Sequence, residues 1–248
     1  MKLRLAAWCL ALLATCNLVR AEPVRLQLAV SEWPPYEFSV RGAPHGLDIE
    51  LARAAVLAMK AEPDFHFYPW KRVLLLAQRQ EVDGILSVRH TPERQQFLVF
   101  PREHLSVSEN VVFVRKGEER ALPTVASLAG QTLGVTAGYS YGEEFDAMVA
   151  SGAIKADESL TEEQGMRKLL AGRYAMLVCD LQAGWYLAQT MGATEQIAVL
   201  PLRVSAVKNY LGFVRNAGGL ARAHRFDAAV ASLKKTGDWQ RIHDAYRR

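Results

Sequence analysis

The segment Val82-Asp83-Gly84-Ile85-Leu86-Ser87-Val88-Arg89-His90-Thr91-Pro92-Glu93-Arg94 decides the fold, because it joins a short apolar run to the start of a helix. The run from Ile85 to Val88 is typical of a strand that is covered on both faces of its sheet. Thr91 then suits a helix N-cap, with Pro92 at the first helical position. We therefore predict a buried strand followed at once by a helix.

Arg94 falls in the first turn of that predicted helix. A cation at a helix start opposes the helix dipole, so local helix stability does not explain this residue. An anion held jointly by the guanidinium group and the free backbone N–H groups would explain it. The alternative is an ordinary helix start that carries a solvated arginine.

Residues 1–21 predict a secretory signal peptide. Lys2 and Arg4 precede an apolar stretch from Leu5 to Thr15, and Val19-Arg20-Ala21 suits a cleavage site. The stretch is too short to span a membrane. We therefore expect a soluble mature chain that is exported, without a lipid anchor.

Removal of this segment changes the charge and the cysteine content. It takes away three basic residues and no acidic one, so the formal charge falls from +4 to about +1. Nothing then favours nucleic acid as a partner. Cys9 and Cys16 also leave, so Cys179 remains alone and no intramolecular disulfide is expected.

The mature chain alternates between strand and helix patterns, as α/β proteins with parallel sheets do. A first series runs through strands at 24–30, 65–68 and 85–88 and helices at 46–60 and 70–80. A second series runs through strands at 132–136, 176–179 and 197–200 and helices at 142–150, 161–172 and 181–191. The chain returns through 210–214 and closes with two helices. We expect two lobes, lobe 1 from residues 22–109 and 208–248 and lobe 2 from residues 110–207, joined by two crossing hinge segments.

Four loops at strand ends form the candidate site, because ligands of open parallel sheets bind beyond the carboxyl ends of the strands. Trp33-Pro34-Pro35-Tyr36 predicts a stiff loop whose two rings wall an apolar part of a ligand, or else pack on their own lobe. Asp180 ends an apolar strand before a helix, where capping alone accounts for it in the simplest case.

The stretch Gly138-Tyr139-Ser140-Tyr141-Gly142 offers two interpretations. Its N–H groups and the Ser140 hydroxyl suit a carboxylate or phosphate oxygen. It also matches the G-x-S-x-G nucleophile elbow of serine hydrolases. Such an enzyme needs a later histidine on a loop, whereas His224 and His243 lie inside predicted helices, so we favour a binding role for Ser140.

Several short motifs, in this order and spacing, resemble the bacterial extracellular solute-binding proteins of family 3 over essentially the whole mature chain. They are Trp33-Pro34-Pro35-Tyr36, Gly46-Leu47-Asp48-Ile49-Glu50-Leu51-Ala52, Asp83-Gly84, Thr91-Pro92-Glu93-Arg94, Leu133-Gly134-Val135 with Gly138, Gly172-Arg173 with Asp180, and Gly237-Asp238-Trp239. The resemblance implies a two-lobed, Venus-flytrap periplasmic binding protein that closes on a small polar solute, an amino acid or a related compound.

The resemblance also implies roles for individual residues. Arg94 would clamp the α-carboxylate of the ligand, Asp180 would take its α-ammonium, and Ser140 would donate to the carboxylate. The predicted ligand-binding residues are Trp33, Tyr36, Ser87, Arg89, Arg94, Tyr139, Ser140 and Asp180. Ser87 and Arg89 occupy the stretch where amino acid binders usually have small polar or acidic residues, so Arg89 either adds positive charge to the pocket or points into solvent.

The resemblance implies neither a cofactor nor a metal, and it favours a monomer that is not an enzyme. The partner would be an inner-membrane ABC permease or the periplasmic domain of a sensor. The main rival is an enzyme on the same scaffold, similar to cyclohexadienyl dehydratases, with Glu32 or Glu143 as general acid or base.

Overall fold

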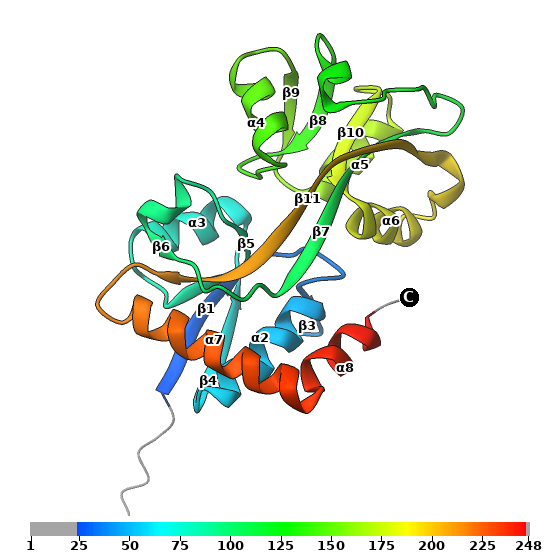
Figure 1. Ribbon diagram of the computed structural model, residues 1–248. Coiled ribbons are helices and arrows are strands. Elements are labelled where there is room, and N and C mark those ends of the chain that lie inside the picture. The colour runs from blue at the N-terminus through cyan, green and yellow to red at the C-terminus, as the bar shows by residue number, and fades with distance from the viewer. Residues whose placement is uncertain (1–23, 247–248) are drawn as a thin grey trace, which may run out of the picture.

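The computed structural model describes residues 24–246, and the predicted signal peptide, with Cys9 and Cys16, lies outside the described residues. Figure 1 shows two α/β lobes, one above the other, joined by two long strands that run side by side. The two-lobed α/β architecture predicted from the sequence is confirmed. No helix of the described part is long and apolar enough to cross a membrane.

Lobe 1, the lower lobe in Figure 1, contains the first and the last parts of the described chain. Its strands are β1 (Val24–Val30), β2 (Phe38–Val40), β3 (Ala43–His45), β4 (Ala61–Phe67), β5 (Gly84–Arg89) and β6 (Leu98–Val99). Its helices are α2 (Leu47–Ala58), α3 (Trp70–Gln78), α7 (Gly219–Thr236), α8 (Asp238–Ala245) and the short 3-10 helix η1 (Arg94–Gln96).

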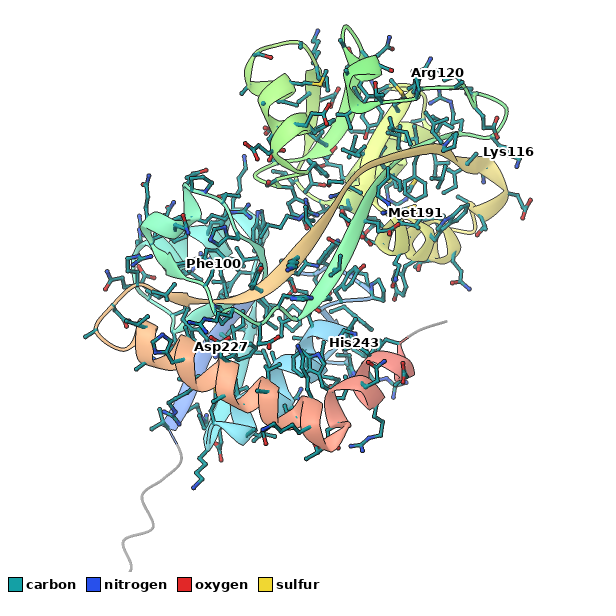
Figure 2. The ribbon with its side chains drawn as sticks, viewed as in Figure 1. Phe100, Lys116, Arg120, Met191, Asp227 and His243 are labelled. Carbon is teal, nitrogen blue, oxygen red and sulfur yellow. The ribbon has the colours of Figure 1, made fainter. Side chains whose placement is uncertain are left out.

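Lobe 2, the upper lobe, is built from the middle of the chain, where Lys116 and Met191 are labelled in Figure 2. Its strands are β8 (Thr132–Thr136), β9 (Lys155–Ser159) and β10 (Met176–Asp180). Its helices are α4 (Glu143–Ala150), α5 (Glu162–Leu170) and α6 (Leu181–Thr190), with 3-10 helices η2 (Val125–Leu128) and η3 (Thr194–Gln196). The connecting strands are β7 (Ser106–Arg115) and β11 (Ile197–Val214).

One sheet runs through both lobes in the order β4-β1-β5-β11-β7-β10-β8-β9. β1 is parallel to β4 and β5, and β10 is parallel to β8, whereas β7 and β11 pair with each other antiparallel. The carboxyl ends of the parallel strands in each lobe therefore meet at one sheet edge, beside the connecting strands. The predicted lobe boundaries at residues 109 and 208 fall within β7 and β11, and the division there stays a prediction.

Two predictions about single elements were wrong. The expected strands at 197–200 and 210–214 are parts of the one strand β11, because most of the segment between them pairs with β7, with two irregularities in the register. The helix expected from Thr91 is only the 3-10 helix η1. The chain has no room for an α-helix there, because Leu98 already pairs with Val214 of β11.

Each lobe has its own apolar core. In lobe 1, α2 and α7 cover the sheet through buried side chains such as Ile49, Phe213 and Phe226. In lobe 2, Leu133, Phe145 and other buried residues pack between the sheet and α4. Burying each such side chain contributes roughly 1.5 to 3 kcal/mol, so each lobe holds its own strand ends in place.

Helix α6 lies close against the connecting strand β7 because Gly184 has no side chain. A Cβ atom at Gly184 would lie 2.3 Å from the ring of Phe113, which is fully buried in β7. Ring atoms at that distance must move. Gly184 therefore sets the spacing between a lobe 2 helix and the strand that leads to lobe 1.

We expect Gly184→Ala to lower the free energy of unfolding by about 1 to 3 kcal/mol, because the added methyl group overpacks the Phe113 contact. Urea denaturation followed by circular dichroism measures the change. Gln189→Ala, at an exposed position of the same helix, is the control and should stay within about 0.5 kcal/mol of the wild type. Equal stabilities of the two variants would contradict the packing argument.

Candidate ligand-binding cleft

A cavity lies between the lobes at the edge where the parallel strands end. Lobe 1 contributes residues that follow β1, the first residue of α3 and residues that lie on or after β5, and lobe 2 contributes the loop after β8. The lining residues are Ser31, Trp33, Glu37, Trp70, Ser87, Arg89, Arg94, Tyr139 and Ser140. The structure thus brings Trp33, Ser87, Arg89, Arg94, Tyr139 and Ser140, all predicted site residues, to one cavity.

Arg94 places a buried cation in this cavity. Its backbone N–H donates to Thr91 Oγ1, and its guanidinium donates to Arg89 O at 3.1 Å and to Gly138 O at 3.0 Å. Burial and, to a smaller extent, the nearby Arg89 lower the pKa of Arg94 to about 10, so the group remains charged at neutral pH. Both acceptors are neutral carbonyls, and no acidic side chain forms an ion pair with Arg94 among residues 24–246.

Arg89 faces the same cavity rather than solvent and is only 7% exposed. Its Nη2 atom donates to Asn110 Oδ1 at 3.1 Å and to Ser108 Oγ at 3.4 Å. Its buried Nη1 atom has no hydrogen-bond acceptor within the described residues. A buried guanidinium N–H without a partner is unfavourable, so a group that accepts from Nη1 would stabilise the site.

A chain of buried acids supports the floor of the cavity. Ser87 Oγ lies 2.9 Å from Glu37 Oε2 and 2.8 Å from Asp48 Oδ2. Glu37 Oε1 accepts from both the N–H and the hydroxyl of Ser31. Ser87 has a single hydroxyl hydrogen, so both contacts are hydrogen bonds only if one of the two carboxyl groups carries a proton.

The protonation of these acids follows from their burial. Burial raises the pKa of Glu37 to about 8, and the Ser31 hydrogen bonds oppose that shift. Burial raises the pKa of Asp48 to about 7. Ser87 itself has a positive φ of 50°, an uncommon conformation for a residue with a side chain. The two carboxyl groups hold Ser87 in that conformation.

The loop after β8 is held by its own lobe and by lobe 1. Ser140 Oγ donates to Asp146 Oδ2 at 2.5 Å, and the N–H of Tyr141 donates to Asp146 Oδ1. The hydroxyl hydrogen expected to reach a ligand carboxylate therefore points to Asp146, because this carboxylate stands in the first turn of α4 beside the loop. The acceptor is a carboxylate rather than an imidazole, which does not support a nucleophilic serine.

Trp33 and Tyr36 pack mainly against side chains of lobe 2 and of β7. Their rings stack with centroids 4.3 Å apart and share a buried cluster with Phe113, Leu177 and Cys179. The hydroxyl of Tyr36 donates to Asp180 Oδ2 at 3.3 Å. Tyr36 and Asp180 are the two predicted site residues that do not line the cavity.

The sequence did not point to Glu37, Trp70 or Glu162 as site residues. Burial raises the pKa of Glu162 to about 8, and Trp70 Nε1 donates to Gly138 O across the cleft at 2.9 Å. Glu37 directly follows Trp33-Pro34-Pro35-Tyr36, whereas Trp70 and Glu162 begin α3 and α5. The directions of their side chains depend on distant strands. Glu32 and Glu143, named as acids for a dehydratase, are exposed and do not line the cavity. No cluster that could hold a metal ion occurs between residues 24 and 246.

A family model of the bacterial extracellular solute-binding proteins, family 3, matches residues 26–248. The chain belongs to this family. An L-arginine-binding protein of Pseudomonas aeruginosa is 22% identical over 250 residues, which cover 98% of this chain and 94% of the relative.

Two solved structures show the same solute-binding-protein fold. A histidine kinase sensor domain with similarity to periplasmic binding proteins aligns with a TM-score of 0.78 at 20% identity, covering 91% of this chain and 96% of the domain. An ancestral arginine-binding protein bound to arginine aligns with a TM-score of 0.76 at 17% identity, covering 90% of this chain and 98% of that protein. The predicted periplasmic-binding-protein fold is confirmed.

We expect Glu37→Gln to flatten the pH dependence of stability. The native carboxyl keeps its proton up to a pKa of about 8, while the unfolded one loses it near 4.5. Stability from this proton is complete below about pH 4.5 and is lost as pH rises through 8. The amide reproduces the protonated form, since its oxygen accepts from Ser31 and its NH₂ donates to Ser87.

Urea denaturation between pH 5 and 8 measures this effect. The free energy of unfolding of the wild type should fall more steeply with pH than that of the variant, by up to about 1.4 kcal/mol per pH unit. Glu119→Gln, at an exposed position, is the control and should follow the wild type. Parallel curves for wild type and Glu37→Gln would show that Glu37 is ionised in the native state.

Proposed function

We propose that this protein captures a small polar solute through a carboxylate group, by closure of its two lobes around the cleft. The observation that carries the proposal is the buried guanidinium of Arg94, which lines the cavity and lacks an acidic partner among the described residues. A carboxylate is the natural complement of such a group, since the two form parallel charge-assisted hydrogen bonds. Amino acids and related compounds are the first candidates, because relatives bind arginine.

Contacts between the lobes support closure as the mechanism. Gly138 O of lobe 2 accepts from Trp70 Nε1 and from Arg94 Nη2 of lobe 1. The Tyr139 ring of lobe 2 packs edge-on against Trp70, with ring centroids 5.8 Å apart. These contacts form only when the lobes are together. A ligand that adds further bonds to both lobes would shift the population toward that arrangement.

We also propose a location and a partner protein for this chain. A signal peptide at residues 1–21 would deliver the mature chain to the periplasm. There it would hand its solute to an inner-membrane ABC permease, or present it to a sensor domain. A permease gene beside this gene would support the first role.

Arg94→Gln should weaken the binding of carboxylates, because it leaves a ligand carboxylate desolvated and unpaired. The expected loss is about 2 to 5 kcal/mol, which is tens- to thousands-fold in Kd. The measurement is isothermal titration calorimetry with L-amino acids and aliphatic acids, and the affinity of each acid is compared with that of its primary amide. Wild-type protein should bind an acid and not its amide.

Arg102→Gln removes an exposed arginine of the same lobe and serves as the matched control. It should bind as the wild type does. Binding of acid and amide with equal affinity, or Arg94→Gln within about threefold of wild type, would refute the carboxylate site.

Trp70→Phe should favour the open form, because it keeps an aromatic ring and removes the hydrogen bond to Gly138 O. Loss of this hydrogen bond, about 1 kcal/mol, predicts roughly fivefold weaker binding of any acid that the wild-type protein binds. Small-angle scattering should show a larger radius of gyration for the variant without ligand, and equal radii for both proteins at saturation. Identical radii without ligand and identical affinities would show that this bond does not hold the lobes together.

A further inference from the structure

Asp180, the residue expected to take a ligand ammonium, has no free acceptor position. Its Oδ1 accepts from the N–H groups of Gln182 and Ala183 at 3.0 and 2.9 Å. Its Oδ2 accepts from the N–H of Glu109 at 3.0 Å and from the hydroxyl of Tyr36 at 3.3 Å. A carboxylate offers about four lone-pair positions, so these four donors saturate it. A ligand ammonium would have to displace one of them.

The charge of Asp180 is also balanced from within the protein. Asp180 pairs with Asn110 across β10 and β7, and the guanidinium of Arg89 donates to the Asn110 side chain. Burial raises the pKa of Asp180 to about 6, whereas its hydrogen bonds and the attraction of Arg89 lower it, so the group is ionised at neutral pH. A ligand ammonium approaching Asp180 would therefore meet the like charge of Arg89.

The cavity itself carries excess positive charge. Arg89 Nη1 has no acceptor within the described residues, and both charged hydrogen bonds of Arg94 end on backbone carbonyls. Burial raises the pKa of Glu37 and of Glu162 to about 8, so both acids are mostly neutral at pH 7. Two guanidinium groups thus face one cavity whose nearest acids are protonated or already paired. This environment favours an anionic ligand that carries no cationic group next to its carboxylate.

We propose that the ligand is an anionic carboxylate that lacks an α-ammonium group, and that Arg89 and Arg94 both bind it. Arg89 takes the place that the ammonium of a zwitterion would occupy, and Asp180 caps α6 and balances Arg89 instead of contacting the ligand. This inference rests on the proposed solute-binding function. It narrows the candidate ligands from amino acids and related compounds to carboxylic acids that have no α-amino group.

The test compares pairs of compounds that differ only in the α-amino group. The pairs are succinate and L-aspartate, glutarate and L-glutamate, propionate and L-alanine, and 5-guanidinopentanoate and L-arginine. Calorimetry on the mature wild-type protein gives the ratio of the two Kd values for each pair that binds. We expect the compound without the amino group to bind more than fivefold tighter. The dicarboxylates and monocarboxylates in the panel show whether one or two anionic groups are needed.

Arg89→Gln provides the second arm, because its amide can still donate to Asn110 while the charge is removed. We expect this variant to bind the preferred acid at least tenfold more weakly and to lose the preference within the pair. Arg120→Gln, an exposed arginine on lobe 2 (Figure 2), is the matched control and should bind as the wild type does. If Arg89→Gln does not fold, the wild-type ratios alone decide.

The outcomes separate the two proposals. A ratio of the two Kd values of fivefold or less overturns this inference and leaves the binding function standing. A preference of the wild type for the amino acid does the same, if Asp180→Asn abolishes that preference. Failure of every acid and every amino acid in the panel to bind overturns both. Tight binding of an acid that Arg89→Gln leaves unchanged also overturns the inference, because Arg89 would then not contact the ligand.

Discussion

The antiparallel pairing of β7 with β11 is the constraint on which the rest of the structure depends. These two strands run from one lobe to the other and are hydrogen-bonded from Asn209 opposite Ser106 to Ile197 opposite Arg115. Because β5 pairs with β11 and β10 pairs with β7, the strand ends of both lobes face each other beside this pair. The cleft is therefore a consequence of sheet topology, and the proposed closure would be a rotation of the lobes about these strands.

The cleft concentrates ionisable groups that water would otherwise stabilise. Arg89, Arg94, Glu37, Asp48 and Asp180 are all less than a tenth exposed. Burying an unpaired charge is costly, and the protein meets that cost in two ways. The acids near Ser87 are partly protonated, and Asp180 is held by four donors. Of these five groups in the described part of the chain, the two guanidinium groups keep donors to spare, so an anion is the ligand proposed for the cleft.

The family and the fold agree with an arginine-binding relative at 22% identity, but the residue type at Arg89 departs from what the family resemblance predicts. The resemblance predicted small polar or acidic side chains around Ser87 and Arg89, and this chain has a buried guanidinium there. That group reaches Asn110, next to Asp180, from the opposite lobe. One residue at a strand end thus contributes strongly to the electrostatics of the cleft, on a fold that other binding proteins share.

The sequence by itself determined the two-lobed α/β fold and the strand ends that carry the site. Apolar runs such as Ile85–Val88, the Asp180 cap and the glycines after the strands are local signals, and local signals survive in any context. It did not determine the length of β11 or the single 3-10 turn at Arg94, because both depend on pairing with distant strands. Only the tertiary structure decided that Glu37 and Asp48 share a proton through Ser87 and that Ser140 donates to Asp146. The same holds for Asp180, whose four donors come from both lobes. A side chain's hydrogen bonds go to whichever groups folding brings beside it, and most of those groups lie far away in the chain.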